Sequence, residues 1–175
     1  MIPRSADIPV LDTARLVLRA PVADDFAAFA TIMEDARAIH MGGPFTRRQA
    51  WSMFCEVLAG WSLLGFGGWS VTARDDGRYL GEVALNHPPG FPEVELGWAL
   101  LPAAEGHGFA AEAARAVRAW AARARGLVAL VSYIDPDNAR SIALAERLGA
   151  VRDPAAAAPE AGTLVFRHPA PEARA

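Results

Sequence analysis

The sequence predicts a single α/β domain of the α+β kind, in which helices flank a mixed, mostly antiparallel sheet. Several stretches carry apolar residues at helical spacing, short strand candidates follow one another between residues 69 and 100, and a strand–helix–strand unit occupies residues 94–134. A chain of 175 residues that is 53% hydrophobic can bury one substantial core rather than two. We expect one domain over residues 1–175, with a core from about 11 to 168 and a frayed tail over 169–175.

The first third of the chain predicts one strand followed by two helices. Residues 15–19 form the strand candidate, and apolar residues from Phe26 to Met33 recur at helical spacing. Thr46 with Gln49 three residues later matches the reciprocal capping pattern that satisfies free amides at a helix start. The buried stripe of this second helix is expected to contain Trp51, Phe54, Cys55 and Leu58.

The middle of the chain predicts three consecutive strands, most simply antiparallel, and then a long helix. Trp69–Ala73 and Tyr79–Asn86 flank a turn at residues 75–77, and Val94–Leu100 is the third strand. An alanine-rich helix follows Pro102 and ends at Gly126. Its buried face is expected to contain Ala110, Ala113, Ala114, Val117, Trp120, Ala121 and Ala124.

The last third of the chain predicts a strand, a short helix and a final strand. Leu127–Ile134 is an apolar run typical of a buried central strand. Asn138 is placed to cap a short helix that ends near Gly149. Thr163–His168 is the final strand candidate, and the alanine-rich residues 154–159 are interpreted as a loop.

Charge and composition exclude several kinds of partner. A formal net charge of -3 and a pI of about 5.8 give no electrostatic reason to expect nucleic acid or an anionic membrane as partner. The sequence shows no signal peptide and no run long enough to span a bilayer, so we expect a cytoplasmic protein. Cys55 is the only cysteine, and no Cys or His cluster has zinc-ligand spacing, so no metal is expected.

A glycine-containing turn joins a predicted strand directly to the long helix. Backbone amides near Gly106, Gly108 and Ala110 would point outward at the positive end of that helix, an arrangement that binds phosphate. A dinucleotide fingerprint needs a third glycine where Ala111 stands, and a nucleoside-triphosphate loop needs a lysine where this chain has Gly-Phe-Ala. A tight connection packed with small residues is the alternative explanation of these glycines.

A second motif follows the predicted central strand, and with it the sequence resembles the GNAT superfamily of acyl-CoA-dependent N-acyltransferases. The likeness is to the subgroup that includes the ribosomal-protein N-terminal acetyltransferases, and it extends over roughly residues 11–168. It is carried by four motifs in the same order along the chain. These are Glu95-Leu-Gly-Trp-Ala-Leu, Gly106-x-Gly108-Phe-Ala-x-Glu112-Ala, Asn138-x-x-Ser141 and Leu148-Gly149-Ala.

The resemblance implies a sheet that is splayed between its fourth and fifth strands, Leu96–Leu100 and Leu127–Tyr133, and that admits the pantetheine arm of acetyl-CoA. Acetyl-CoA would be a co-substrate, and no metal is implied. Backbone groups of the fourth strand would pair with the arm, while loop amides hold the pyrophosphate. Asn138 would hydrogen-bond the arm or simply cap its helix. The implied binding residues are Trp98, Ala99, Leu100, Glu105, Gly106, His107, Gly108, Phe109, Ala110, Asn138 and Ser141.

The implied activity is transfer of an acetyl group to a primary amine, either a protein N-terminus or a small amine, by direct attack. Glu95 is the first candidate for the general base and Glu82, on the preceding strand, is the second; a solvent-facing strand glutamate is the alternative for Glu95. Ala145 stands where many relatives carry the tyrosine that protonates the thiolate, so Ser141 becomes the candidate acid.

Two departures from the family pattern favour an alternative function. Ala103 replaces the usual Arg or Gln at the opening of the phosphate loop, although His107 could supply partial positive charge there, and Ala145 removes the usual acid. The alternative is a catalytically weak, CoA-binding regulatory module. A third possibility, an α/β binding domain unrelated to CoA, requires both motifs to be coincidental.

The amine acceptor cannot be decoded from the sequence, because residues 33–68 and 87–92 should determine it and no motif rule covers them. Aromatic residues there could line an acceptor site or form ordinary core, and an exposed patch could be a dimer face, so the protein is expected to be a monomer or a homodimer. These aromatic residues are Trp51, Phe54, Trp61, Phe66 and Phe91.

Overall fold

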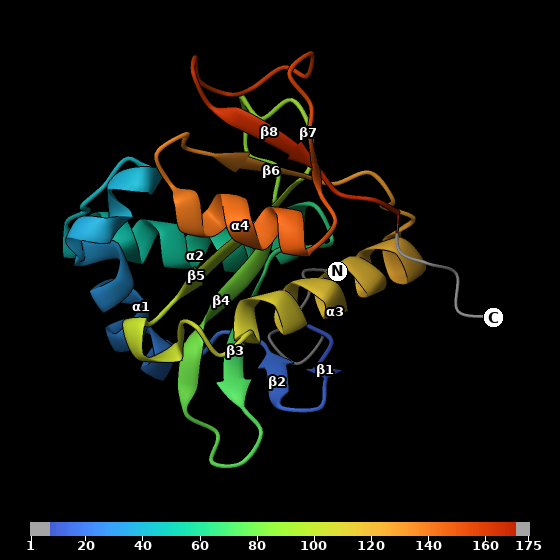
Figure 1. Cartoon of the computed structure of the whole chain (residues 1–175). Helices are drawn as coiled ribbons and strands as arrows, with labels where there is room; N and C mark the ends of the chain where they lie inside the picture. The colour runs from blue at the N-terminus through green and yellow to red at the C-terminus, as the bar shows by residue number, and fades with distance from the viewer. Residues whose placement is uncertain (1–7, 171–175) are drawn as a thin grey trace.

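The structure, a computed structural model, describes residues 8–170 (Figure 1). Residues 1–7 and 171–175, the latter being most of the predicted tail, lie outside the described residues. The strands are β1 (Leu11–Asp12), β2 (Leu16–Arg19), β3 (Gly68–Ala73), β4 (Tyr79–Asn86), β5 (Glu95–Leu100), β6 (Val131–Ile134), β7 (Val151–Arg152) and β8 (Leu164–Arg167). The helices are α1 (Phe26–Glu34), α2 (Arg47–Leu63), α3 (Phe109–Arg125) and α4 (Ala139–Arg147), with shorter 3-10 helices η2 (Ala23–Asp25), η3 (Ala36–Met41) and η4 (Pro102–Ala104).

The strands form one sheet in the order β1-β2-β3-β4-β5-β6-β8-β7. Every neighbouring pair is antiparallel except β5 and β6, which are parallel. The predicted mixed, mostly antiparallel sheet flanked by helices is therefore confirmed, including the β3–β4 hairpin and β5. The sequence does not predict β1 and β7, because two residues are too few to show the alternation that identifies a strand.

The parallel strands β5 and β6 meet at one end and then diverge, which confirms the predicted splay. Their ladder contains a single pair, Glu95 with Val131. One residue further, the Ser132 hydroxyl spans the widening gap by donating to the Leu96 carbonyl at 2.6 Å. The predicted strand from residue 127 is too long, since β6 begins only at Val131. The reason is that the Leu127 amide bonds back to Ala121 and closes the end of α3.

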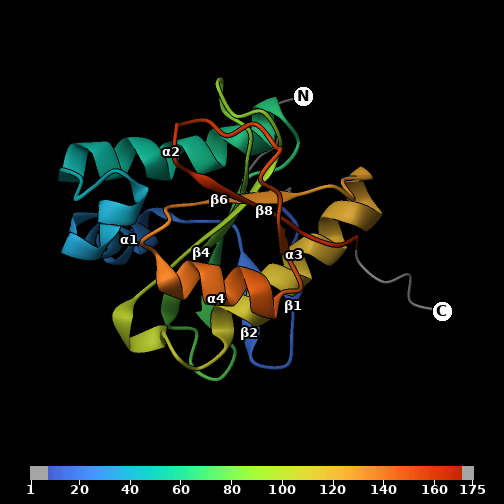
Figure 2. The same ribbon diagram turned by 45° about the horizontal axis from the view of Figure 1, so that its top comes forward.

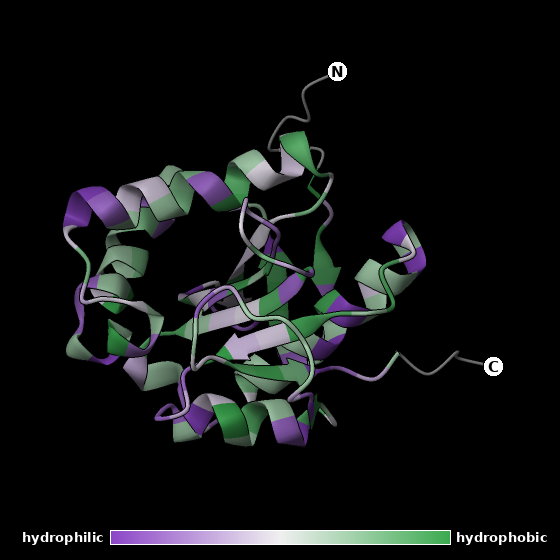
Figure 3. Ribbon diagram, turned by 90° about the horizontal axis from the view of Figure 1, so that it is seen from above, coloured by the Kyte–Doolittle hydropathy of each residue, from purple (hydrophilic) through white to green (hydrophobic). Residues whose placement is uncertain are grey.

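Helices cover both faces of the sheet. The buried face of α3 packs on β2, β4 and β5, while α1 lies over β4 on the opposite face and α2 packs beside it (Figures 1 and 2). At one end of the sheet, Trp61, Trp69 and Trp120 pack edge to face, with ring centroids 4.6 to 5.3 Å apart. Figure 3 shows hydrophobic residues in the central strands and hydrophilic residues on outer turns of the helices.

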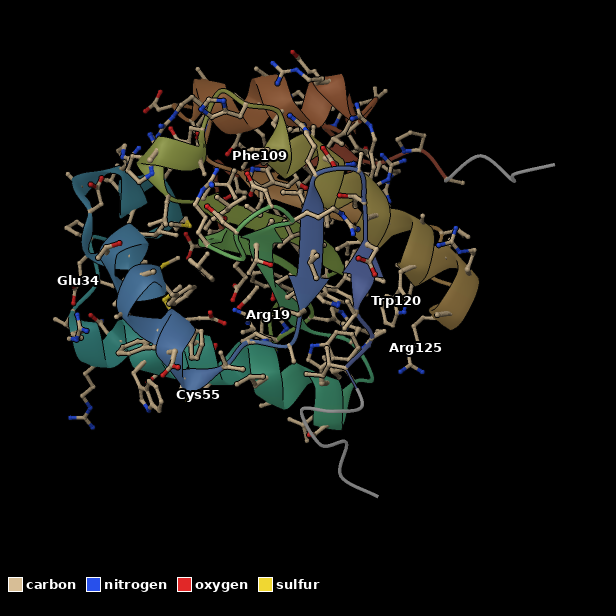
Figure 4. The ribbon with its side chains drawn as sticks, turned by 90° about the horizontal axis from the view of Figure 1, so that it is seen from below. Arg19, Glu34, Cys55, Phe109, Trp120 and Arg125 are labelled. Atoms are coloured by element: carbon tan, nitrogen blue, oxygen red, sulfur yellow. The ribbon has the colours of Figure 1, made fainter. Side chains whose placement is uncertain are left out.

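Most of the helix predictions hold, and the exceptions concern which side chains are buried. Thr46 caps α2 with Gln49, as predicted. Trp51, expected in the buried stripe of α2, is 47% exposed because it packs on Phe26 at the rim of the helix pair. Cys55, labelled in Figure 4, is only partly buried. Ala124 is exposed because the last turn of α3 extends beyond the sheet.

Candidate active site

One large cavity, of about 1330 Å³, occupies the splay between β5 and β6 and continues over the sheet beneath α1. Its walls include backbone and side chains of both diverging strands, the loop before α3, and one face of α4. The starts of α3 and α4 lie beside the diverging strands (Figures 1 and 2). Residues 87–91 and several residues of the predicted acceptor segment, 33–68, also line it. The volume exceeds that of most small-molecule sites, so the cavity has room for a long substrate and a second one.

The loop before α3 presents unpaired backbone amides to this cavity. Gly106 and Gly108 have φ angles of 79° and 80°, which only glycine adopts without strain. Gly108 is the N-cap of α3 and no side chain caps the helix. Within residues 8–170, the amides from Gly106 to Ala111 donate to no backbone or side-chain acceptor. The loop therefore forms a cradle for an anion at the positive end of a helix, as its sequence predicts.

Three arginines compensate the acidic residues of the cradle. Glu105 accepts from Arg37 of η3 at 3.3 Å and from Arg140 of α4 at 2.7 Å. Glu112 pairs with Arg15 at 2.7 Å, and the Arg15 guanidinium also donates to the His107 carbonyl and stacks on Phe109. Arg37 also pairs with Asp35 at 2.8 Å, so three arginines stand against three carboxylates around the loop. The arginines therefore balance the acidic side chains here, and the free backbone amides are the groups left to receive an anion.

Two carboxylates lie on the floor of the cavity, on the sheet face beneath α1. Glu95 accepts a hydrogen bond from the Asn86 side chain at 3.0 Å. Burial raises the pKa of Glu95 above the ordinary value, although this bond and the neighbouring Tyr133 amide favour the charged form. Glu82 lies further along the same face, opposite Ala99. Burial raises the pKa of Glu82 to about 8. Both predicted base candidates therefore face the same cavity.

The wall formed by α4 holds the second motif. The Asn138 side chain accepts from the Ser141 amide at 3.1 Å, so the predicted helix cap is present. The Ser141 hydroxyl accepts from the indole N–H of Trp98 across the splay at 3.3 Å. Asn138, Ser141 and Trp98 all line the cavity. Ala145 is fully buried against β6 and β8, so its position cannot hold an acid in this chain.

The structure brings together every site residue predicted from the sequence except His107, which is exposed and does not line the cavity. Lining residues that the sequence did not predict include the polar side chains of Arg37, His40, Tyr133 and Arg140. His40 contacts Asp135 at 2.9 Å and thereby ties η3 to the loop after β6. No local pattern marks these side chains, because each acts across a contact between segments distant in the chain. Of these residues, only Arg140 could have been predicted from the sequence, because it lies within the Asn138-x-x-Ser141 motif.

The fold and the site define an acyl-CoA-dependent acetyltransferase, and comparison with known proteins establishes the family. The model of the Acetyltransferase (GNAT) domain matches residues 15–151. The chain belongs to the GNAT family. An acetyltransferase from Agrobacterium tumefaciens is 42% identical, with 92% of this chain and 94% of that chain covered and a TM-score of 0.89. A GNAT-family protein from Bordetella pertussis is 28% identical over 91% of this chain and 97% of that one, with a TM-score of 0.73.

A ribosomal-protein N-acetyltransferase shares the fold of this chain. RimL, a ribosomal L7/L12 α-N-protein acetyltransferase solved in complex with coenzyme A, has the same fold. It is 15% identical, with 91% of this chain and 96% of that chain covered and a TM-score of 0.71.

Residues 8–170 contain neither a metal-binding cluster nor a membrane-spanning helix. Among these residues, no group of three or more His, Cys, Asp or Glu side chains is arranged to hold a metal ion. None of the helices in this range combines the length and hydropathy needed to cross a membrane.

Proposed function

We propose that the protein transfers the acetyl group of acetyl-CoA to a primary amine, either the N-terminus of a protein or a small-molecule amine. The observation that carries the proposal is the single cavity that joins the cradle at Gly106 and Gly108 to the carboxylates of Glu95 and Glu82. Free amides suit phosphate oxygens, and carboxylates suit an ammonium group. The two substrates would meet above β5, so the amine could attack the thioester directly.

The acetyl-CoA end of the site would use the backbone more than side chains. Because β6 diverges after Ser132, the side of Trp98–Leu100 that faces the splay lacks a strand partner and is available to the amides of the pantetheine arm. Loop amides from Gly106 to Ala110 would receive the pyrophosphate, whereas the Glu105 amide donates to the Pro102 carbonyl. Asn138 and Ser141 would contact the arm from α4.

The amine end of the site would use carboxylates and a hydroxyl. An incoming amine is mostly protonated at neutral pH and must lose a proton before it attacks. Glu95 and Glu82 are the groups on the cavity floor that can bind the ammonium and accept this proton. Ser141 is the hydroxyl placed to protonate the departing thiolate, directly or through water.

Calorimetric titration with acetyl-CoA, followed by a free-thiol assay with N-terminal peptides and small amines, tests the proposal. Gly106→Ala should weaken acetyl-CoA binding about tenfold, because a φ of 79° strains any L-residue by about 1–2 kcal/mol and shifts the amides. Gly77→Ala is the matched control: it has a similar φ of 74° and an equally open surrounding, but lies in the β3–β4 turn. It should lose similar stability and keep its affinity.

Each outcome of this assay has a distinct meaning. Binding with amine-dependent thiol release supports the transferase. Binding without release for every amine would favour the CoA-binding regulatory module instead. Absence of acetyl-CoA binding by the wild-type protein would show that the cradle at residues 105–110 has been misinterpreted.

Gly97→Ala should reduce catalytic efficiency with the amine while leaving acetyl-CoA affinity within about twofold. A Cβ at position 97 would lie 3.2 Å from the Asn86 side-chain nitrogen, which must move by a few tenths of an ångström, and in ordinary contact, at 3.5 Å, with a Glu95 carboxylate oxygen. Because Asn86 donates to that carboxylate, its displacement disturbs the position of Glu95. We expect a loss of about tenfold in kcat/KM for the amine, since small misplacements of a group that positions a substrate have effects of this order or larger. Steady-state kinetics and calorimetry measure the two quantities. A wild-type kcat/KM in this variant would separate the position of Glu95 from catalysis.

A further inference from the structure

Glu82 is a buried carboxylate for which residues 8–170 provide no hydrogen-bond partner. It is 8% exposed, and burial is the whole cause of its raised pKa, with no hydrogen bond or nearby cation opposing it. Its side chain nevertheless lines the cavity. Leaving an acid buried without a partner costs free energy, so its retention on the cavity floor indicates that a group from outside completes it.

Glu95 differs from Glu82 in its surroundings. The Asn86 side chain donates to its carboxylate, and this hydrogen bond together with the neighbouring Tyr133 amide favours the charged form. Glu95 is therefore suited to remain an anion and to hold a cation in place. Glu82 lacks such donors and can take up or release a proton without breaking a hydrogen bond.

The strand register places Glu82 beside the middle of β5. It faces Ala99 directly, within the segment whose backbone borders the splay. Ala84, Gly97 and Ala99 project from the same sheet face, and their small size leaves open space above it. A group that approaches the thioester from the α1 side passes over this space and reaches Glu82.

We propose that Glu82 is the proton acceptor of the acetyl transfer and that Glu95 binds and orients the acceptor's ammonium group. This assignment rests on the proposed function. The ammonium passes one proton to the Glu82 carboxylate and becomes a neutral amine. Its nitrogen lone pair forms the C–N bond to the acetyl carbon, the C–S bond breaks with its electrons going to sulfur, and the nitrogen loses a second proton as the thiolate gains one. The products are the amide and the thiol, and Glu82 returns its proton to water.

The environment of Glu82 matches this role. A base works best when its pKa lies near the working pH, and burial brings that of Glu82 to about 8. Approach of the ammonium adds an opposite charge and favours the ionised carboxylate at the moment it is needed. Tyr79 is a titratable neighbour of Glu82 on β4: burial, and then the charge of Glu82, raise the pKa of its phenol, which therefore stays protonated throughout the working pH range.

Kinetics of Glu82→Gln and Glu95→Gln, with Glu34→Gln as control, test the assignment. Glu34 is a glutamate at the end of α1 outside the cavity, so its variant should match the wild type. With the best amine found for the wild type, Glu82→Gln should lower kcat at least about 100-fold and keep acetyl-CoA affinity within about twofold. Its rate should keep rising with pH up to the pKa of the amine. Glu95→Gln should mainly raise KM for the amine.

A second variant, together with the wild type, distinguishes failure of the proposed function from failure of the Glu82 assignment. Glu82→Asp retains the acid but withdraws it by one methylene. Its kcat should therefore lie between those of the wild type and Glu82→Gln, and its rate should depend on pH as that of the wild type does. If the wild type transfers no acetyl group to any amine, the proposed function fails and this assignment with it. If the wild type is active and Glu82→Gln keeps its kcat and pH profile, only the assignment of Glu82 is overturned.

Discussion

Asp25→Ala is expected to lower the free energy of unfolding by about 3 kcal/mol, because it removes the centre of a buried polar cluster. Asp25 is 5% exposed and accepts from both terminal nitrogens of Arg19, at 2.7 and 2.8 Å, and from the Ser70 hydroxyl at 2.7 Å. It also accepts from the Val22 amide. The cluster joins β2 and β3 to the turn that begins α1. Burial alone would raise the pKa of Asp25, but these donors outweigh it and keep the pKa below the ordinary value.

The size of this effect follows from what the substitution leaves behind. Ser70 is buried and would lose its hydrogen-bond acceptor, whereas Arg19 is about one-third exposed and can be partly rehydrated. We therefore expect the lower end of the range for a broken buried ion pair. Asp24→Ala, at the exposed neighbouring position, is the matched control and should stay within about 0.5 kcal/mol of the wild type. Urea denaturation at pH 7 compares the three proteins, and equal midpoints would contradict the prediction.

Stability of this cluster should also depend on pH. Because the folded pKa of Asp25 lies below its unfolded value, its contribution is present above about pH 4 and is lost as pH falls through the folded pKa.

Much of the fold could be predicted because its signals are local. The Thr46–Gln49 capping pair, the hairpin turn at residues 75–77 and Gly126, with a φ of 66°, all act within a few residues of chain. The burial of individual residues is less local. Trp51 is apolar and correctly spaced, yet it stays 47% exposed because it lies at the rim of the α1–α2 pair, where only one side of its ring packs on Phe26. The start of β6 also differs from the prediction, since the Leu127 amide donates to the Ala121 carbonyl and closes the end of α3.

The candidate site divides in the same way. The cradle could be predicted because Gly106 and Gly108 adopt positive φ angles beside a helix start. Such a backbone conformation favours glycine, so the sequence indicates it. The sequence does not indicate the arginines around the cradle, because Arg37 and Arg140 reach Glu105 from 68 and 35 residues away along the chain. The difference between Glu82 and Glu95 is likewise invisible in the sequence, because it lies in the donors that surround each carboxylate.

Glu82 and His168 should shape the pH dependence of stability in opposite directions. His168 is 4% exposed, and its Nε2 bonds to the Ser132 hydroxyl, while burial, aided by the Arg118 charge, lowers its pKa to about 4. An unfolded histidine titrates near 6.5, so the unfolded state binds more protons and stability falls as pH drops from about 6.5 to 4. For Glu82 the folded pKa of about 8 exceeds the unfolded value near 4.5, so stability falls as pH rises from about 4.5 to 8.

Glu82→Gln should therefore be more stable than the wild type at pH 8, by on the order of 4 kcal/mol, and equal to it near pH 4. Between pH 4.5 and 6.5 the contributions of Glu82 and His168 oppose each other in the wild type, and the variant keeps only that of His168. The stability of the variant relative to the wild type should therefore rise with pH from about 4.5 to 8. Urea denaturation at pH 4.5, 5.5, 6.5 and 8 gives the difference between the two proteins, from which other titrating groups cancel. A difference that does not change with pH would contradict the buried, unpaired state of Glu82. A variant that gains stability and loses turnover together would show that the wild type retains a destabilising acid for its chemistry.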